Sequence, residues 1–261
     1  MQKSRFLTLF LLLPCMAHAS IIDNCEVGCP TGGSAQTVVR EVYTLNNNRD
    51  RKFANWVAYK ITKASQSGGR SRSWKRDPDL PSTDTLAPAA YQGSSAALAV
   101  DRGHQAPLAG LGADVDWKAL NYLSNITPQA SALNQGAWKR LEDKERELAL
   151  RRDVAAVWSV TGPLFERHIG TLPAAPGVEI PSGYWKIIFI GASPEEGEYA
   201  AFILDQTTPK NANFCDALVT VAEIERRTHP ALSFWSALPA QKVQSLKTRK
   251  GKLAQEMGCP D

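Results

Sequence analysis

The stretch DRGH, Asp101 to His104, places an acid, an arginine and a histidine side by side after a short apolar run. An imidazole, with an ordinary pKa of about 6.5, is a natural base for removing a proton at neutral pH. A single histidine at the end of a strand is also commonly structural. The tetrapeptide by itself leaves both interpretations open.

A segment rich in carboxamides follows at residues 121–138, with the sequence NYLSNITPQASALNQGAW. Amide oxygens are hard ligands that suit Mg²⁺, an ion that keeps most of its waters and takes few protein oxygens. The alternative is that these side chains form turns and cap helices. The amides concerned are Asn121, Asn125, Gln129, Asn134 and Gln135.

Residues 134–152 are predicted to form the main helix, because apolar residues recur at helical spacing in a charged segment. A second set of residues repeats every four positions: Asn134, Trp138, Glu142 and Arg146. This ridge offers an amide oxygen, a carboxylate and a guanidinium, which suits a site holding a metal and a phosphate. The alternative needs no function, because Glu142 and Arg146 also fit a surface ion pair that stabilises a helix by about 0.2–0.5 kcal/mol.

The remaining pattern predicts an α+β (mixed α/β) fold with a largely antiparallel central sheet and flanking helices. Alternating or β-branched runs predict strands, and AALAV predicts a further short buried strand at residues 96–100. A shorter helix is predicted at 220–228, where Thr220 and Glu223 resemble a capping box. A surface excursion rich in proline and glycine is expected at 162–183. The other strand candidates are 53–62, 154–162, 184–191 and 199–205.

The first 19 residues are predicted to be a secretory signal peptide. Lys3 and Arg5 precede the apolar run FLTLFLLLP, and small residues flank a cleavage site after Ala19. Residues 20–261 would then form a single domain, secreted to the periplasm or beyond the cell. The mature chain has no other segment apolar enough to cross a membrane, so no membrane partner is expected.

Four cysteines remain after residue 19: Cys25, Cys29, Cys215 and Cys259. An even number in a secreted chain favours two disulfides, for which three pairings exist. Proximity favours Cys25–Cys29, which leaves Cys215–Cys259. A four-cysteine zinc site is the alternative, but its usual paired short spacings are missing.

The formal net charge of +4 is too small for a protein that coats nucleic acid by bulk charge. Charge is nevertheless concentrated at residues 49–76, which hold nine Lys and Arg residues and one acid. A local basic surface of this kind can steer a polyanion. The alternative is a solvated, charged loop.

The strings DRGHQAP, NYLSNITPQ, LNQGAW and RLEDKER, taken in order, resemble the DNA/RNA non-specific endonucleases. This Serratia-type secreted nuclease family has a ββα-metal, or His-Me finger, catalytic core. The resemblance extends over the mature chain from Cys25 to Cys259. It implies the same disulfide pairing that proximity favours.

The resemblance assigns roles to individual residues. His104 matches the general base that takes a proton from the attacking water. Asn134 matches the one direct protein ligand of a single Mg²⁺, for which Mn²⁺ substitutes, and Glu142 matches the carboxylate that holds the ion through water.

Four further residues match active-site positions. Arg146 and Arg72 match arginines at the cleaved phosphate, with Arg70 as the nearby competitor for the second position. Arg102 and Asn125 match additional active-site positions without separately defined roles.

The resemblance therefore implies a secreted, Mg²⁺-dependent endonuclease without sugar specificity. It would hydrolyse single- and double-stranded DNA and RNA to 5′-phosphorylated oligonucleotides through phosphate contacts. It also implies a homodimer, although no residue of the sequence fixes the oligomeric state. The alternatives are a secreted nucleic-acid-binding module of the same fold without turnover, and a hydrolase of other phosphodiesters.

Overall fold

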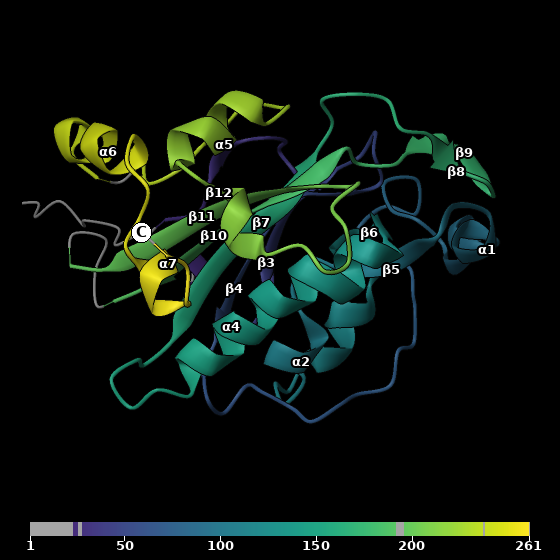
Figure 1. The fold of residues 1–261 in the computed structure, drawn as a ribbon. Helices are drawn as coiled ribbons and strands as arrows, with labels where there is room; N and C mark the ends of the chain where they lie inside the picture. Colours follow the sequence, from purple (N-terminus) through teal and green to yellow (C-terminus); the bar gives the residue numbers. More distant parts are fainter. Residues whose placement is uncertain (1–22, 26–27, 192–195, 237, 261) are drawn as a thin grey trace, which may run out of the picture.

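The centre of the computed structural model is a seven-stranded antiparallel sheet with the strand order β12-β11-β10-β7-β4-β3-β2 (Figure 1). The structure describes residues 23–25, 28–191, 196–236 and 238–260, so the predicted signal peptide at 1–19 lies outside the described residues. The strands of the sheet are β2 Thr37–Val39, β3 Thr44–Asn48, β4 Phe53–Ile61, β7 Val157–Leu164, β10 Gly183–Ile190, β11 Glu198–Asp205 and β12 Leu218–Val219. The predicted fold class is confirmed.

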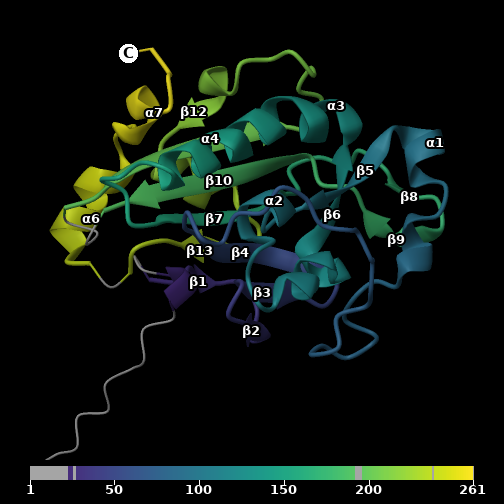
Figure 2. The same cartoon turned by 90° about the horizontal axis from the view of Figure 1, so that it is seen from below.

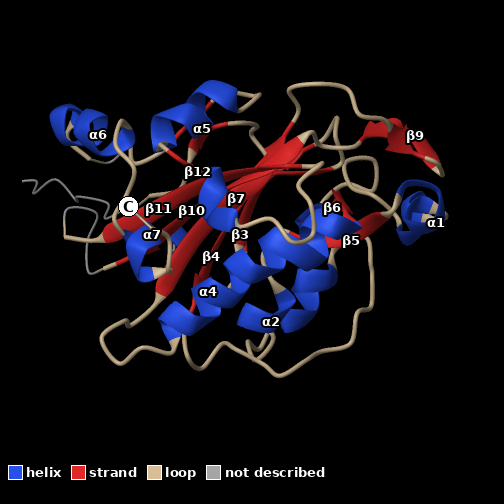
Figure 3. Ribbon diagram, in the orientation of Figure 1, coloured by secondary structure: helices blue, strands red, loops and turns tan. Residues whose placement is uncertain are grey.

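Both faces of this sheet are buried, because alternate residues of its strands enter different cores. In β4, Val57 and Tyr59 belong to one core, whereas Trp56 and Ala58 belong to the other. Helices α2, α4 and α7 pack on the first face and helices α5 and α6 on the second (Figures 1 and 3). The helices are α1 Ser94–Leu98, α2 Leu108–Leu111, α3 Ser131–Leu133, α4 Lys139–Ala149, α5 Val221–Arg227, α6 Ala240–Lys247 and α7 Leu253–Glu256.

The four longer predicted strands are all present, as β4, β7, β10 and β11. The excursion between β7 and β10 contains a small hairpin of β8 Thr171–Leu172 and β9 Ala175–Glu179. The chain then returns to the same sheet, where β10 pairs antiparallel with β7. The predicted helix at 220–228 is α5, and the Thr220 side chain accepts a hydrogen bond from the Glu223 main-chain nitrogen at 3.1 Å.

The predicted strand at 96–100 is wrong for its first four residues. Residues 94–98 form helix α1, and only Val100 enters a strand. Gly93 and Ala99, at the two ends of this helix, have left-handed backbones with φ of 76° and 50°. Leu98 is exposed, so the apolar composition of this segment does not reflect burial.

A ββα unit lies beside the large sheet. Strand β5 Val100–His104 pairs antiparallel with β6 Ile126–Ala130, and the chain then enters a helix formed by α3, a π turn and α4. Figure 2 shows this hairpin at the end of the molecule opposite α6 and α7. The helix begins three residues before the predicted start at 134 and ends at Ala149 rather than at residue 152.

The π turn, Asn134–Trp138, depends on a glycine at its centre. Gly136 has φ −110° and ψ −114°, and a Cβ atom there would lie 2.4 Å from the main-chain oxygen of Lys210. This non-helical residue makes a kink between α3 and α4. The predicted apolar stripe is buried on both sides of this turn, at Leu133 and Leu141.

A buried ion pair joins α4 to the sheet. Lys186 Nζ lies 2.7 Å from Glu145 Oε2 and also donates to the Tyr59 hydroxyl at 2.7 Å. Tyr59 in turn donates to Glu145 Oε1 at 2.8 Å. Because each charged group is paired and hydrogen-bonded, the network fixes the helix against β4 and β10 without an uncompensated buried charge.

The structure forms both expected disulfides, Cys25–Cys29 and Cys215–Cys259. The second closes a loop with a sequence separation of 44 and ties the region after β11 to the residues after α7. Loop-closure entropy assigns such a bridge a stabilisation of about 4 kcal/mol. Among the described residues, no helix combines the length and apolar character needed to span a membrane.

Candidate active site

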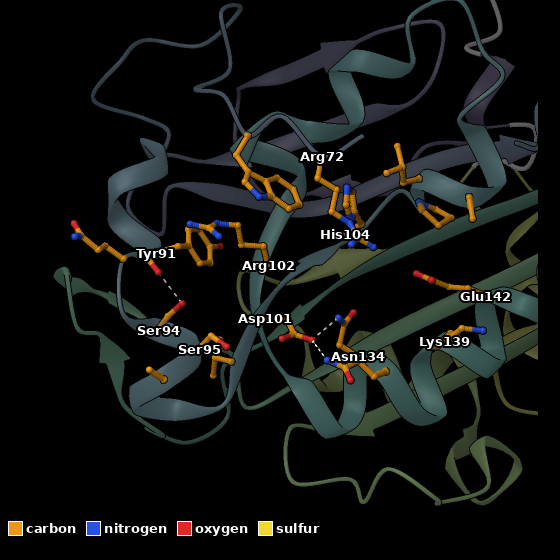
Figure 4. A pocket seen from close by; sticks show the side chains of 18 of the residues that line it. Arg72, Tyr91, Ser94, Ser95, Asp101, Arg102, His104, Asn134, Lys139 and Glu142 are labelled. Carbon is orange, nitrogen blue, oxygen red and sulfur yellow. Dashed lines mark hydrogen bonds between the residues drawn. The ribbon is translucent and has the colours of Figure 1, made fainter. Parts of the chain in front are cut away.

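A cleft of about 850 Å³ lies between the ββα unit and the loop before it (Figure 4). Its walls come from loop residues Arg72 and Trp74, strand β5, the segment around α1 and the helix after β6. Of the predicted site residues, it brings together Arg72, Arg102, His104, Asn134, Glu142 and Arg146. Asn125 does not line it.

His104 ends strand β5, and its ring orientation follows from its neighbours. The amide of Asn121 donates through Nδ2 to the Ser71 main-chain oxygen at 3.4 Å, which turns its oxygen toward the histidine. Asn121 Oδ1 lies 3.4 Å from His104 Nε2. This arrangement favours the tautomer with the proton on Nε2, so that Nδ1 carries the free lone pair.

The environment of His104 favours the neutral imidazole. Its pKa is lowered to about 4, chiefly by burial and also by the positive charge of Arg72, against the opposing hydrogen bond to Asn121. The ring of Trp74 packs against the imidazole with 5.3 Å between ring centroids. At neutral pH the side chain therefore has the protonation state that a general base requires.

Asn134 is oriented by Asp101, a residue that the sequence interpretation did not include in the site. Asp101 Oδ2 accepts hydrogen bonds at 2.9 Å from the side-chain nitrogens of Asn134 and Gln135. Ser131 Oγ donates to Oδ1 of the same carboxylate at 2.6 Å. With its nitrogen held by Asp101, the Asn134 amide turns its oxygen away from this carboxylate. The position of Asp101 in the DRGH string was the available signal for its role.

Glu142 lies two turns along the same helix. Its pKa is raised to about 7, chiefly by burial and also by the charge of Glu145, against the opposing charge of Lys186. Trp138 Nε1 donates to Glu142 Oε1 at 3.0 Å. The carboxylate is therefore poised near neutrality, and a positive charge placed beside it would favour its ionised form.

Glu142 and Arg146 do not form the side-chain ion pair that their spacing suggested. Arg146 Nη2 instead lies 2.5 Å from Asp143 Oδ1, three residues earlier, and Nη1 donates to the main-chain oxygen of Glu142 at 3.4 Å. The reason is competition: Trp138 holds the Glu142 carboxylate, and Asp143 is an equally near neighbour on the helix.

Replacing Trp138 by Phe is expected to lower kcat/KM about ten- to a hundredfold, the value of a hydrogen bond to a charged group. The ring would remain buried, but Glu142 would lose its donor. The measurement is steady-state cleavage of DNA beside a thermal unfolding curve. Trp185→Phe is the matched control, because Trp185 is fully buried and its Nε1 has no hydrogen-bond partner among the described residues. Equal losses of kcat/KM in both variants would contradict this role.

Arg102 lies at the edge of the cleft and packs between two aromatic rings. Its guanidinium carbon is 5.2 Å from the centre of the Tyr91 ring and 5.7 Å from that of Trp74. Nη2 donates to the main-chain oxygen of Pro88 at 3.4 Å. Arg102 therefore secures the strand that ends in His104, while its side chain still lines the cleft.

Arg72 and Arg70, the two competing loop arginines, have different environments. Arg70 Nε donates to the Gly112 main-chain oxygen at 2.6 Å, and its guanidinium lies 5.0 Å from the centre of the Trp117 ring. Arg72 is exposed, lines the cleft and makes no hydrogen bond or ion pair with another described residue. Of the two, Arg72 is the arginine available to a ligand.

Asn125 is fully buried beneath the cleft, and its side-chain amide is hydrogen-bonded to the main chain. Its Oδ1 accepts from the Ala106 nitrogen at 2.8 Å, and Nδ2 donates to the main-chain oxygens of Leu120 and Ala106. These bonds hold the residues that follow His104. The structure thus gives Asn125 a positioning role rather than a contact with a ligand.

The basic residues at 49–76 have different partners. Arg72 is the one member of this stretch in the cleft. Arg51 pairs with Glu179 at 2.6 Å and Lys60 with Asp23 at 2.9 Å. Neither of these two pairs lines the cleft, so Arg72 is the basic residue of this stretch whose charge a ligand in the cleft would meet.

The donor set fits an ion that is held mainly by water. Among the described residues, no three His, Cys, Asp or Glu side chains gather to hold a metal. Asn134 and Glu142 offer one amide oxygen and one carboxylate in a shared cleft. Mg²⁺ commonly binds through so few protein oxygens, because it keeps several of its waters.

A family model described as DNA/RNA non-specific endonuclease matches residues 22–241. The chain belongs to this family and is an endonuclease, which confirms the resemblance found in its sequence.

Individual relatives agree with this assignment. The chain is 59% identical over 240 residues to a nuclease of Serratia marcescens, covering 91% of this chain and 90% of that protein. It is 28% identical over 228 residues to the mitochondrial endonuclease G of Homo sapiens, covering 78% and 71% respectively. A chain of the solved EndoG/EndoGI complex superposes with a TM-score of 0.70 over 87% of this chain and 96% of that chain. At 20% identity, the last match establishes the fold alone.

Proposed function

We propose that this endonuclease hydrolyses both DNA and RNA, single- and double-stranded, in a Mg²⁺-dependent reaction that leaves 5′-phosphates. The observation that supports this most is one cleft that holds a neutral histidine, an amide oxygen, a carboxylate and an arginine with no hydrogen-bond or ion-pair partner among the described residues. A binding module has no need of a base, so this combination favours turnover over binding alone.

In this mechanism, Nδ1 of His104 takes the proton of a water that attacks the phosphorus in line with the departing 3′ oxygen. Arg72 and Arg146 supply fixed positive charge where negative charge develops on the phosphate. Asn134 and Glu142 would hold the Mg²⁺, the amide oxygen directly and the carboxylate through water. When bound, the ion would stabilise charge on the phosphate and on the leaving oxygen, and Mn²⁺ would serve in its place.

Lack of sugar and sequence specificity follows from the groups involved. Each of the named side chains acts on phosphate, water or metal, and phosphate contacts carry no direct sequence information. Cleavage of both nucleic acids requires only that the 2′-hydroxyl is neither bound nor excluded.

The active form proposed is residues 20–261, a single nuclease domain exported after removal of residues 1–19. The two disulfides support this route, because such bridges persist in oxidising compartments. The family resemblance supports a homodimer.

Metal removal provides the test. The purified 20–261 protein is incubated with supercoiled plasmid and with structured RNA, each in Mg²⁺ and in excess EDTA. Both substrates should be degraded in Mg²⁺ alone, and end-group analysis should find 5′-phosphates. Binding of DNA without cleavage in Mg²⁺ would instead identify a nucleic-acid-binding module.

A further inference from the structure

Helix α4 brings a second row of charged side chains to the cleft, beside the residues used in the proposed mechanism. Lys139 and Asp143 both line the cleft together with Glu142 and Arg146. Figure 4 shows Lys139 on the same helix as Asn134 and Glu142. The mechanism above gives neither Lys139 nor Asp143 a role.

Helix stability does not account for Lys139. Its Nζ lies 2.7 Å from Asp143 Oδ2, but the side chain is 60% exposed, and exposed pairs contribute about 0–1 kcal/mol. In this pair the lysine also precedes the acid by four residues, which is the less favourable order on a helix.

Asp143 is shared between two cations that could instead contact two neighbouring phosphates. One carboxylate oxygen contacts Lys139, and the other lies 2.5 Å from Arg146 Nη2. Two oxygens of one anion therefore bridge an ammonium and a guanidinium on the wall of the cleft. An oxygen of each of two neighbouring phosphates can replace the two carboxylate oxygens as acceptors, and charge-assisted bonds of this kind are the strong ones.

We propose that Lys139 binds a backbone phosphate next to the scissile one, forming a second phosphate subsite of the cleft with Asp143 as its occupant in the free enzyme. This inference rests on the proposed function, in which Arg146 contacts the scissile phosphate. The charged groups of Lys139 and Arg146 both contact Asp143, so they lie close enough together to bind adjacent phosphates of one strand. Substrate would draw Lys139 and Arg146 away from Asp143.

The test compares Lys139→Gln with Lys144→Gln. Lys144 lies on the same helix, is 36% exposed and pairs with Glu147 at 2.7 Å, but it does not line the cleft. Lys139→Gln should raise KM for DNA and RNA alike, about three- to tenfold, with kcat nearly unchanged. The slope of log affinity against log salt for duplex DNA should become shallower by about 0.9, the loss of one phosphate contact. Lys144→Gln should leave both quantities at wild-type values.

Affinity for a DNA duplex is also measured in EDTA, without turnover, so the subsite is tested even if cleavage fails. Asp143→Asn should tighten binding in this assay, because it removes the carboxylate that competes with phosphate. The subsite is refuted if Lys139→Gln matches Lys144→Gln in KM and in salt slope. Weaker binding by Asp143→Asn would show that phosphate does not displace Asp143 from the two cations. Failure of the wild type to cleave DNA in Mg²⁺ would refute the proposed function, while the salt slope would still decide the subsite.

Discussion

His104→Ala should cleave DNA about 10³- to 10⁴-fold more slowly than the wild type, at the upper end of what general base catalysis contributes. The structure gives a specific reason for so large a loss. Burial and Arg72 keep the imidazole neutral, and Asn121 directs the protonated nitrogen away from the cleft. Alanine leaves no group there that can accept a proton from water at neutral pH.

The measurement is single-turnover cleavage of plasmid DNA in Mg²⁺, beside DNA affinity in EDTA and the unfolding temperature. Affinity and fold should be retained, because His104 is not among the charged groups that attract phosphate. Added imidazole should restore part of the rate by supplying the missing base. His168→Ala is the control, since its side chain is 67% exposed and lies beside Glu179, outside the cleft. A cleavage rate of His104→Ala close to that of the wild type would show that His104 is not the general base.

Local periodicity was sufficient to predict the scaffold of this site. The alternation of residues in 53–62 predicts that Val57 and Tyr59 point to one side of the strand and that Trp56 and Ala58 point to the other. In the structure these two pairs enter different cores. Arg102 and His104 are two residues apart in a strand and therefore share one face. Such patterns are reliable because each depends on neighbours within a few residues of the chain.

Features set by distant contacts were not predictable in this way. The π turn at Gly136 is shaped by the main chain of Lys210, more than 70 residues away, and no local pattern reports that contact. Asn125 resembled an active-site amide, yet its hydrogen bonds to Ala106 and Leu120 place it beneath the cleft. Residues 96–98 were apolar enough for a buried strand, but burial depends on what packs over them.

Asn134→Ala is expected to lower kcat/KM about 10²- to 10³-fold at a fixed Mg²⁺ concentration. The amide nitrogen of Asn134 is engaged by Asp101 at 2.9 Å, so its oxygen is the atom free to bind a cation. In the proposed metal site, removing that oxygen would leave Glu142, through water, as the remaining protein group for the ion. The loss should therefore appear chiefly as a higher Mg²⁺ requirement, measured by titrating the cleavage rate with the metal.

The neighbouring amide separates loss of a metal ligand from loss of a hydrogen bond. Gln135 donates to the same Asp101 oxygen at 2.9 Å, so Gln135→Ala removes an equivalent bond. It should leave the Mg²⁺ requirement close to the wild-type value. If both variants shift the titration equally, the Asp101 network controls the site and Asn134 is not the ligand. A shift confined to Asn134→Ala, with affinity for DNA in EDTA unchanged, assigns the metal to that single amide oxygen.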